Sequence, residues 1–364
     1  MAATAGSSSS AQTSLPLGKY LASTGCSQCE IASTDVVQQD KKTRDKAIKN
    51  LTTFLSQSAG NKDTNGAPLS KSEMAKLWKG IFYCFWMSDK PLVQQALATE
   101  IAEILLVIPN TAASLTFLRG FWEATVREWA GIDRLRIDKY YMFIRRFTNA
   151  SFRLLQRESW DNTLVGEYNS ILTDLGGPLC PEDVKVPSSL PYHLADIYLE
   201  ELDKALTQSP SSDSSDPPTP PAPLTTLLDP FISLAARTPA KLTVQRIESA
   251  LLEPLFDALD CALPSKSQTE KSDDENADGE EEEENNTRSR KRPRLAEDPE
   301  FPNILAHSLL AKEGGDEAST VAQLKKVLLK RLFEVASEDK TRDANRRKMY
   351  KFWKARADDV DEAE

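Results

Sequence analysis

The fold is decided by residues 77–98, LWKGIFYCFWMSDKPLVQQALA. In residues 77–87 apolar side chains cover every face of a helix except a narrow polar stripe around Lys79 and Tyr83. We therefore expect this helix to be buried on most of its circumference. Pro91 fits the first turn of a second helix, where its missing N–H costs nothing. The stretch predicts two helices joined by a tight corner.

The rest of the chain is also typical of helices. Ser88 or Asp89 is expected to cap the helix that follows the corner, because either side chain can accept from its free N–H groups. No strictly alternating run rivals the helical spacing, so no sheet is expected. Long helices joined by short turns predict an all-α, HEAT-like helical-repeat solenoid, although no repeat recurs at a fixed period. The expected helices are 38–57, 70–87, 91–107, 111–130, 133–157, 162–175, 190–207, 224–236, 242–259, 318–336 and 340–356.

Composition predicts where this array is interrupted. Residues 208–223 hold six prolines and cannot form a helix, so they are expected to be a surface linker. Residues 265–298 lack apolar periodicity and cannot bury enough surface to offset their ordering entropy. The expected organisation is a disordered tail 1–36, a helical-repeat domain 37–207, the linker 208–223, a continued repeat domain 224–264, a disordered acidic then basic insertion 265–298, C-terminal helices 299–357 that cap the array, and an acidic tail 358–364.

Overall composition bounds the class of protein. The net charge of −10 does not suggest a general nucleic-acid binder, yet acidic and basic residues are concentrated in separate runs. The five cysteines are mostly isolated, which argues for a reducing compartment, and Cys26 and Cys29 lack the second pair that a zinc site needs. No apolar stretch approaches the roughly 20 residues that cross a bilayer, and residues 1–15 do not resemble a secretory signal. We expect a soluble, intracellular protein with no membrane partner.

Enzymatic chemistry finds little support in the sequence. The two histidines, His193 and His307, lie far apart, and neither has metal-ligand or nucleophile spacing around it. His193 and Asp196 would share a helix face, but one histidine and one aspartate are too few for a metal-dependent hydrolase. Asp133 and Asp138 would diverge by about 140° on a helix instead of converging on one metal. We therefore expect no catalytic residue, no metal and no cofactor.

Two helices carry basic residues that could contact RNA. In the helix expected over 133–157 these residues fall along one flank, where a row of cations can track phosphates without reading sequence. A solvated face with partners four residues away explains the row equally well. On the last helix, aromatic residues mixed with basic ones could either dock on the array or stack against bases. The RNA-contact candidates are Arg136, Lys139, Arg146, Arg153, Arg157, Arg346, Arg347 and Lys351.

The insertion carries a second kind of basic cluster. Its residues form a nuclear-import candidate, because an import receptor must capture an extended basic chain. The neighbouring acidic block, Asp273 to Glu284, is most simply a solvating spacer, and it could also shield basic assembly proteins. The nuclear-import candidates are Arg288, Arg290, Lys291, Arg292 and Arg294.

Three blocks carry a family resemblance. They are residues 77–98, the run from Trp122 to Arg146, and the run from Leu190 to Leu202, LPYHLADIYLEEL. Together they resemble the ribosomal RNA-processing protein 1 family, also called the nucleolar protein 52 family, over about residues 37–357. Ser189 stands where a glycine is expected in the family, which affects the loop entering the third block.

The resemblance implies a non-catalytic nucleolar factor that joins precursor ribosomes and is needed for precursor rRNA processing, mainly for the large subunit. Such a scaffold would bind ribosome-assembly proteins, precursor rRNA and a nuclear import receptor. The alternative is a protein-only interaction adaptor of the nuclear transport type, which never contacts RNA.

Overall fold

The protein is described by a computed structural model, which covers residues 46, 48–53, 55, 70–207, 220–263, 300–308 and 317–361, with the side chains of 317–319 and 358–361 left out. Within these ranges the chain forms helices, turns and loops and no strand, which confirms the all-α prediction. The predicted tail 1–36, the insertion 265–298 and most of the linker lie outside the described residues. None of the described helices is both long and apolar enough to cross a membrane.

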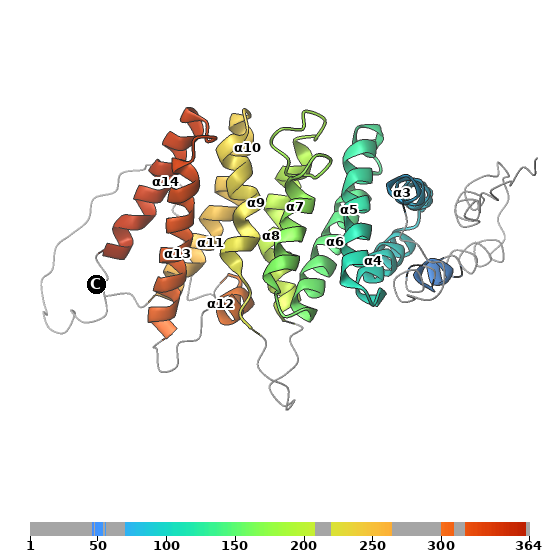
Figure 1. Cartoon of the computed structure of the whole chain (residues 1–364), viewed down its shortest axis with the longest axis horizontal. Helices are drawn as coiled ribbons and strands as arrows, with labels where there is room; N and C mark the ends of the chain where they lie inside the picture. Colours follow the sequence, from blue (N-terminus) through green and yellow to red (C-terminus); the bar gives the residue numbers. More distant parts are fainter. Residues whose placement is uncertain are drawn as a thin grey trace, which may run out of the picture. The chain divides into compact units, whose positions relative to one another are not determined.

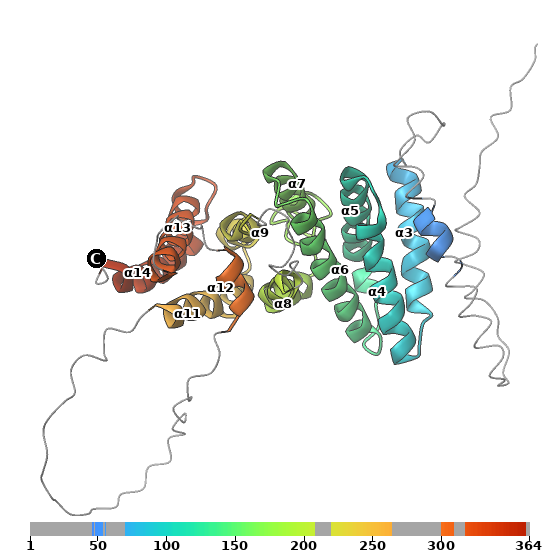
Figure 2. The same cartoon turned by 90° about the horizontal axis from the view of Figure 1, so that it is seen from below.

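The chain divides into two compact units, Met1–Ile197 and Tyr198–Glu364. From residue 70 onward, the helices of the first unit are α3 (Lys71–Trp86), α4 (Pro91–Val107), α5 (Thr111–Glu128), the short 3₁₀ helix η1 (Trp129–Gly131), α6 (Ile137–Arg157), α7 (Asn162–Thr173) and the first part of α8 (Ser189–Leu206). The described residues between 46 and 55 are helical as well. In this unit α3 packs on α5, α5 on α7 and α4 on α6, so these helices contact their next-but-one neighbours (Figures 1 and 2). This pattern produces two layers, the helical-repeat arrangement that helix length and burial predict.

Side-chain capping explains where α3 begins, but not where α4 begins. Ser70 and Glu73 form a capping box at the start of α3, in which Glu73 N donates to Ser70 Oγ and Ser70 N donates to Glu73 Oε2. The expected cap of α4 is wrong, because its N-cap residue is Lys90 and makes no side-chain hydrogen bond. Ser88 instead donates back to Cys84 O of α3, so the corner is held from the preceding helix.

Aromatic rings form the core of the first unit. Trp78 lies within 4.5 to 5.6 Å, centroid to centroid, of Phe117, Phe121 and Phe147, and its indole N–H donates to Phe117 O at 3.0 Å. Gly120 of α5 lies against the Trp78 ring with no space for a side chain. This close approach seats α3 directly on α5.

The second unit continues with the rest of α8, α9 (Leu224–Arg237), α10 (Lys241–Ile247), a π-helical turn η2 (Glu248–Leu252), α11 (Glu253–Ala262), α12 (Pro302–Ser308), α13 (Glu317–Ser337) and α14 (Asp343–Asp361). The span predicted as one helix over 242–259 is therefore α10, η2 and α11. Pro254 gives the reason, since it has no N–H and would clash with the carbonyl four residues before it. In the wider turn, Glu253 N donates to Glu248 O. Within this unit α13 packs on α14, α9 and α11 (Figure 2).

Candidate nucleic-acid interface

Most of the predicted basic row lies on one flank of α6, and the C-terminal part of this flank, with Arg153 and Arg157, faces α4. Buried residues, including Tyr140, Ile144, Phe147 and Leu155, cover the opposite side, as the apolar spacing indicates. Arg153 forms an ion pair with Glu103 of α4. Arg157 donates from Nη1 to Leu106 O at 2.7 Å. Two of the five predicted cations therefore join α6 to α4.

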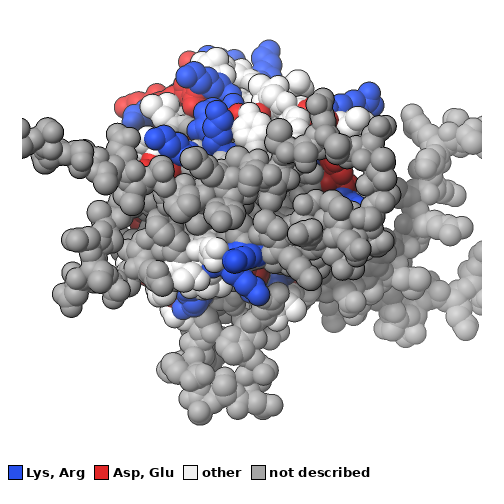
Figure 3. All heavy atoms as spheres, turned by 90° about the vertical axis from the view of Figure 1, so that its right-hand side faces the viewer, with Lys and Arg blue, Asp and Glu red and all other residues white. Residues whose placement is uncertain are grey.

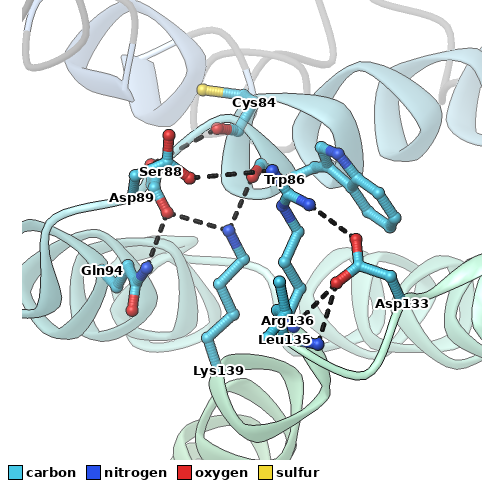
Figure 4. Close-up of polar contacts among 9 residues, drawn as sticks. All are labelled: Cys84, Trp86, Ser88, Asp89, Gln94, Asp133, Leu135, Arg136 and Lys139. Carbon is cyan, nitrogen blue, oxygen red and sulfur yellow. Dashed lines mark hydrogen bonds and ion pairs between the residues drawn. The ribbon is translucent and has the colours of Figure 1, made fainter.

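Lys139 occupies a different environment from the exposed row that the sequence predicts. Only 6% of the residue is exposed, and its ammonium donates to Trp86 O at 2.6 Å and to Ser88 O at 2.8 Å (Figure 4). Trp86 is the last residue of α3, where no intrahelical N–H is left to satisfy the carbonyl, and Ser88 lies just beyond the C-cap Met87. Burial lowers the pKa of Lys139 below the usual value for lysine. The correction is that Lys139 braces the corner between α3 and α4 and does not face solvent.

Arg136 belongs to the same corner. Its guanidinium donates to Asp133 Oδ2 at 2.6 Å and lies 5.0 Å from the centroid of the Trp86 ring (Figure 4). Asp133 also accepts from the backbone N–H groups of Leu135 and Arg136, both at 3.0 Å. The hydrogen bond from the Arg136 side chain is the main reason why the pKa of Asp133 falls below its usual value. Asp133 therefore holds a loop, and α6 begins at Ile137 instead of at residue 133.

The C-terminal candidates fall into two kinds. Arg346 closes the end of α13, because its guanidinium donates to Ala336 O at 3.0 Å and to Glu338 O at 2.9 Å. Arg347 and Lys351 are exposed on α14, as Arg146 is on α6. None of these three makes an ion pair with another described residue. Of the eight predicted RNA-contact residues, these three are the exposed ones without an ion pair among the described residues, and the charge of Lys351 also acts on Glu248.

The described surface is not uniformly basic. Seen from the side where α3 lies, Lys and Arg side chains gather at the top, with Asp and Glu among them, and a smaller basic group lies below (Figure 3). Phosphate contact by the described residues seen in this view would thus involve cations next to carboxylates. The nuclear-import candidates 288–294 lie outside the described residues.

The residues considered for catalysis have structural contacts. His193 Nε2 lies 3.1 Å from Tyr141 O, and the two rings are 4.3 Å apart. Burial lowers the pKa of His193, which favours the neutral imidazole at pH 7. In the part of the chain that the structure describes, no group of three or more His, Cys, Asp or Glu residues could hold a metal ion.

Sequence reasoning considers the aromatic residues of the last helix but misses Phe333, which joins two of them in an exposed group. Phe333 of α13 is 44% exposed and lies 5.3 Å from Tyr350 and 5.2 Å from Trp353 of α14, measured between ring centroids. The sequence contains a signal for it, since Phe333 is followed four residues later by the polar Ser337 on the same helix face. That α14 brings two more rings to this face cannot be read from the spacing alone.

Comparison with known proteins gives consistent matches. A family model described as nucleolar protein Nop52 matches residues 33–353. The human Ribosomal RNA processing protein 1 homolog A is 30% identical over 319 residues, which is 85% of this chain and 66% of that protein. The human homolog B is 36% identical over 222 residues, or 61% of this chain and 27% of that protein. The Drosophila melanogaster homolog is 30% identical over 217 residues, which is 59% of this chain and 28% of that protein. The chain thus spans between about a quarter and two thirds of these relatives' lengths.

Proposed function

The chain belongs to the Nop52 family of nucleolar proteins, as its three sequence blocks indicate, and from that membership we propose that it takes part in rRNA processing in the nucleolus. The family match over residues 33–353 carries the proposal, because it includes both structural units. The relatives are named for ribosomal RNA processing, and the proposal extends that role to this chain.

The chain would act as a scaffold of the precursor ribosomal particle, mainly that of the large subunit, and would not cleave RNA itself. Layered helices expose long edges and loops to partners, which suits binding of ribosome-assembly proteins. Arg146, Arg347 and Lys351 are exposed and can contact phosphates of precursor rRNA, a contact that does not depend on sequence. These features support a brace for folded RNA.

Purification of the tagged protein from cells tests this role. We expect assembly proteins by mass spectrometry and precursor rRNA by sequencing. Depleting the protein should make unprocessed precursors of large-subunit rRNA accumulate on a Northern blot. Unchanged precursors after depletion, with no rRNA in the purified fraction, would refute the proposal.

Direct RNA contact needs a separate experiment. Replacing Arg347 and Lys351 by Glu should reduce crosslinking to RNA in cells, because two exposed cations become anions. Replacing Lys76 and Lys79, two exposed lysines of α3, by Glu changes the net charge equally and serves as the control. If the parent enters the particle and yet never crosslinks to RNA, the protein-only adaptor is the better description.

Nuclear entry is proposed to depend on an import receptor that binds the basic cluster. Changing Arg288, Arg290, Lys291, Arg292 and Arg294 to Ala should lower nuclear accumulation in cell images without changing the melting temperature. Undiminished nuclear accumulation would indicate another signal or entry with a partner.

A further inference from the structure

The hairpin of α13 and α14 presents aromatic side chains outward. The rings of Tyr350 and Trp353 are tilted by 46° and 52° against that of Phe333, so they do not close over it as a parallel stack would. Phe333 remains 44% exposed. The three side chains, here called the aromatic triad, thus leave ring surface open to a ligand.

The triad is separate from the core of the hairpin. Met349 and Phe352 of α14 are 7% and 8% exposed, and Phe352 lies 5.5 Å from Phe256 of α11. Val335 and Ala336 of α13 are also buried. These residues already seal α14 onto the unit, so the packing does not account for an additional outward group of aromatic rings.

Exposed cations surround the triad at helical spacing. Arg347 precedes Tyr350 by three residues, and Lys354 follows it by four, so all three share one face of α14. On α13, Lys330 precedes Phe333 by three residues and has a 76% exposed side chain. Glu334 also lies near this face, where it is within 4.0 Å of Lys330 and 3.7 Å of Arg331. The border of the triad is therefore mainly basic.

We propose that the aromatic triad binds unpaired nucleotides of RNA, an inference that rests on the proposed function and names its RNA partner. Bases would stack on Phe333 and Trp353, while the backbone phosphates would contact the neighbouring cations. Aromatic platforms beside basic grooves bind single strands in this way, because every base has a π-face. The hydroxyls of Ser337 and Tyr350, 3.0 Å apart, can exchange hydrogen bonds with a base edge.

An acidic protein segment could also meet cations and rings, but the observations favour RNA. Open ring faces suit flat bases, whereas a peptide side chain is better held in a closed apolar pocket. Duplex RNA fits less well, because its bases are stacked inside the helix and leave no free face for the triad.

Fluorescence anisotropy with the purified full chain tests the inference. The probes are a short single-stranded RNA of mixed sequence and a duplex of the same length. Phe333→Leu keeps an apolar side chain and loses the ring, so we expect single-strand affinity to fall about tenfold without a change in melting temperature. Trp353→Ala should lower the affinity for the single strand by a similar factor. Tyr83→Ala removes an aromatic residue of similar exposure, 49%, from α3 and is the matched control, with affinity unchanged.

The salt dependence separates stacking from phosphate contact. Phe333→Leu should leave the slope of log affinity against log salt unaltered, whereas Arg347→Glu with Lys354→Glu should flatten it. Equal affinity of parent, Phe333→Leu and Trp353→Ala for the single strand would overturn the inference. The inference would also be overturned if these variants lost an acidic protein partner while they still bound RNA. A parent protein that bound the duplex more tightly than the single strand would overturn it as well. In each case co-purification with precursor rRNA still decides the proposed function independently.

Discussion

Replacing Gly120 by Ala should destabilise the first unit, although alanine is the better helix former. A Cβ at this position of α5 would lie 2.4 Å from Trp78 Cδ1 and 2.8 Å from Met74 Cγ. Carbon atoms normally pack about 3.5–4.0 Å apart, so the indole ring would have to move by about 1 Å. It cannot withdraw easily, because it is 1% exposed and its N–H is bonded to Phe117 O.

Two opposing terms set the size of the effect. Overpacking of a close-packed core costs about 1–3 kcal/mol, and weakening the indole hydrogen bond adds about 1 kcal/mol. The gain in helix propensity returns about 0.8–1.0 kcal/mol. We therefore expect the free energy of unfolding to fall by about 1–3 kcal/mol.

Gly166→Ala is the matched control for this change. Gly166 is exposed in α7, and a Cβ there would meet no atom within 4 Å, so only the propensity gain of about 0.8–1.0 kcal/mol remains. Urea unfolding followed by tryptophan fluorescence reports mainly on the first unit, which holds every tryptophan except Trp353. If Gly120→Ala proves as stable as the parent, the reasoning about this contact is refuted.

Three further changes test other parts of the structure. Ser159→Gly should raise the unfolding free energy by about 0.5–1 kcal/mol, because Ser159 holds the left-handed φ of 53° that suits glycine; a lower melting temperature would contradict this. Lys139→Met should lower the free energy of unfolding by about 2–4 kcal/mol in urea unfolding, because two charge-assisted hydrogen bonds to carbonyls disappear. An unchanged free energy of unfolding would mean that the corner between α3 and α4 does not depend on these bonds. Burial, and then the nearby Glu253, raise the pKa of Glu248, so the parent loses stability as the pH rises through that pKa. Glu248→Gln should therefore melt higher than the parent at pH 7 and equally below about pH 4, and equal melting at both would exclude the effect.

Local signals are sufficient for most of the helices. The predicted span 91–107 equals α4, and 70–87 exceeds α3 by one residue at each end. At both starts the chain carries its own instruction, a capping box at Ser70 and a proline at position 91. Such signals involve residues within one helical turn, so the start of these helices can be predicted from a single sequence.

Contacts between distant segments are where prediction from the sequence fails. The short helix α12 was not predicted, and its start is held by Asp203 of α8, whose Oδ1 accepts from Asn303 N at 2.8 Å and from Ile304 N at 2.9 Å. Seven residues cannot sustain a helix by propensity alone. The cap comes from a residue 100 positions earlier, and no local pattern reveals it.

The same limit applies to the basic row of α6. Helical spacing shows that cations share a flank, but it does not show what lies opposite that flank. Here the opposite surface is α4 together with the end of α3. Arg153 pairs with a carboxylate of α4, while Arg157 and Lys139 donate hydrogen bonds to carbonyls at the ends of α4 and α3. A phosphate would have to replace these contacts, and exchanging one charge-assisted hydrogen bond for another gains little net free energy.

RNA affinity should accordingly come from cations that have no such role. Around the aromatic triad these are Arg347 and Lys354, joined by Lys330, whose carboxylate neighbour Glu334 lies 4.0 Å away on an exposed face. A single strand releases about 0.7 counterions for each phosphate that is neutralised. Three contacts predict a slope of log affinity against log salt of roughly −2. A much steeper slope would require additional cations, and the basic cluster at 288–294 could supply them. The Ala variant of that cluster would then bind RNA with the shallower slope, which would separate the contribution of the insertion from that of the folded surface.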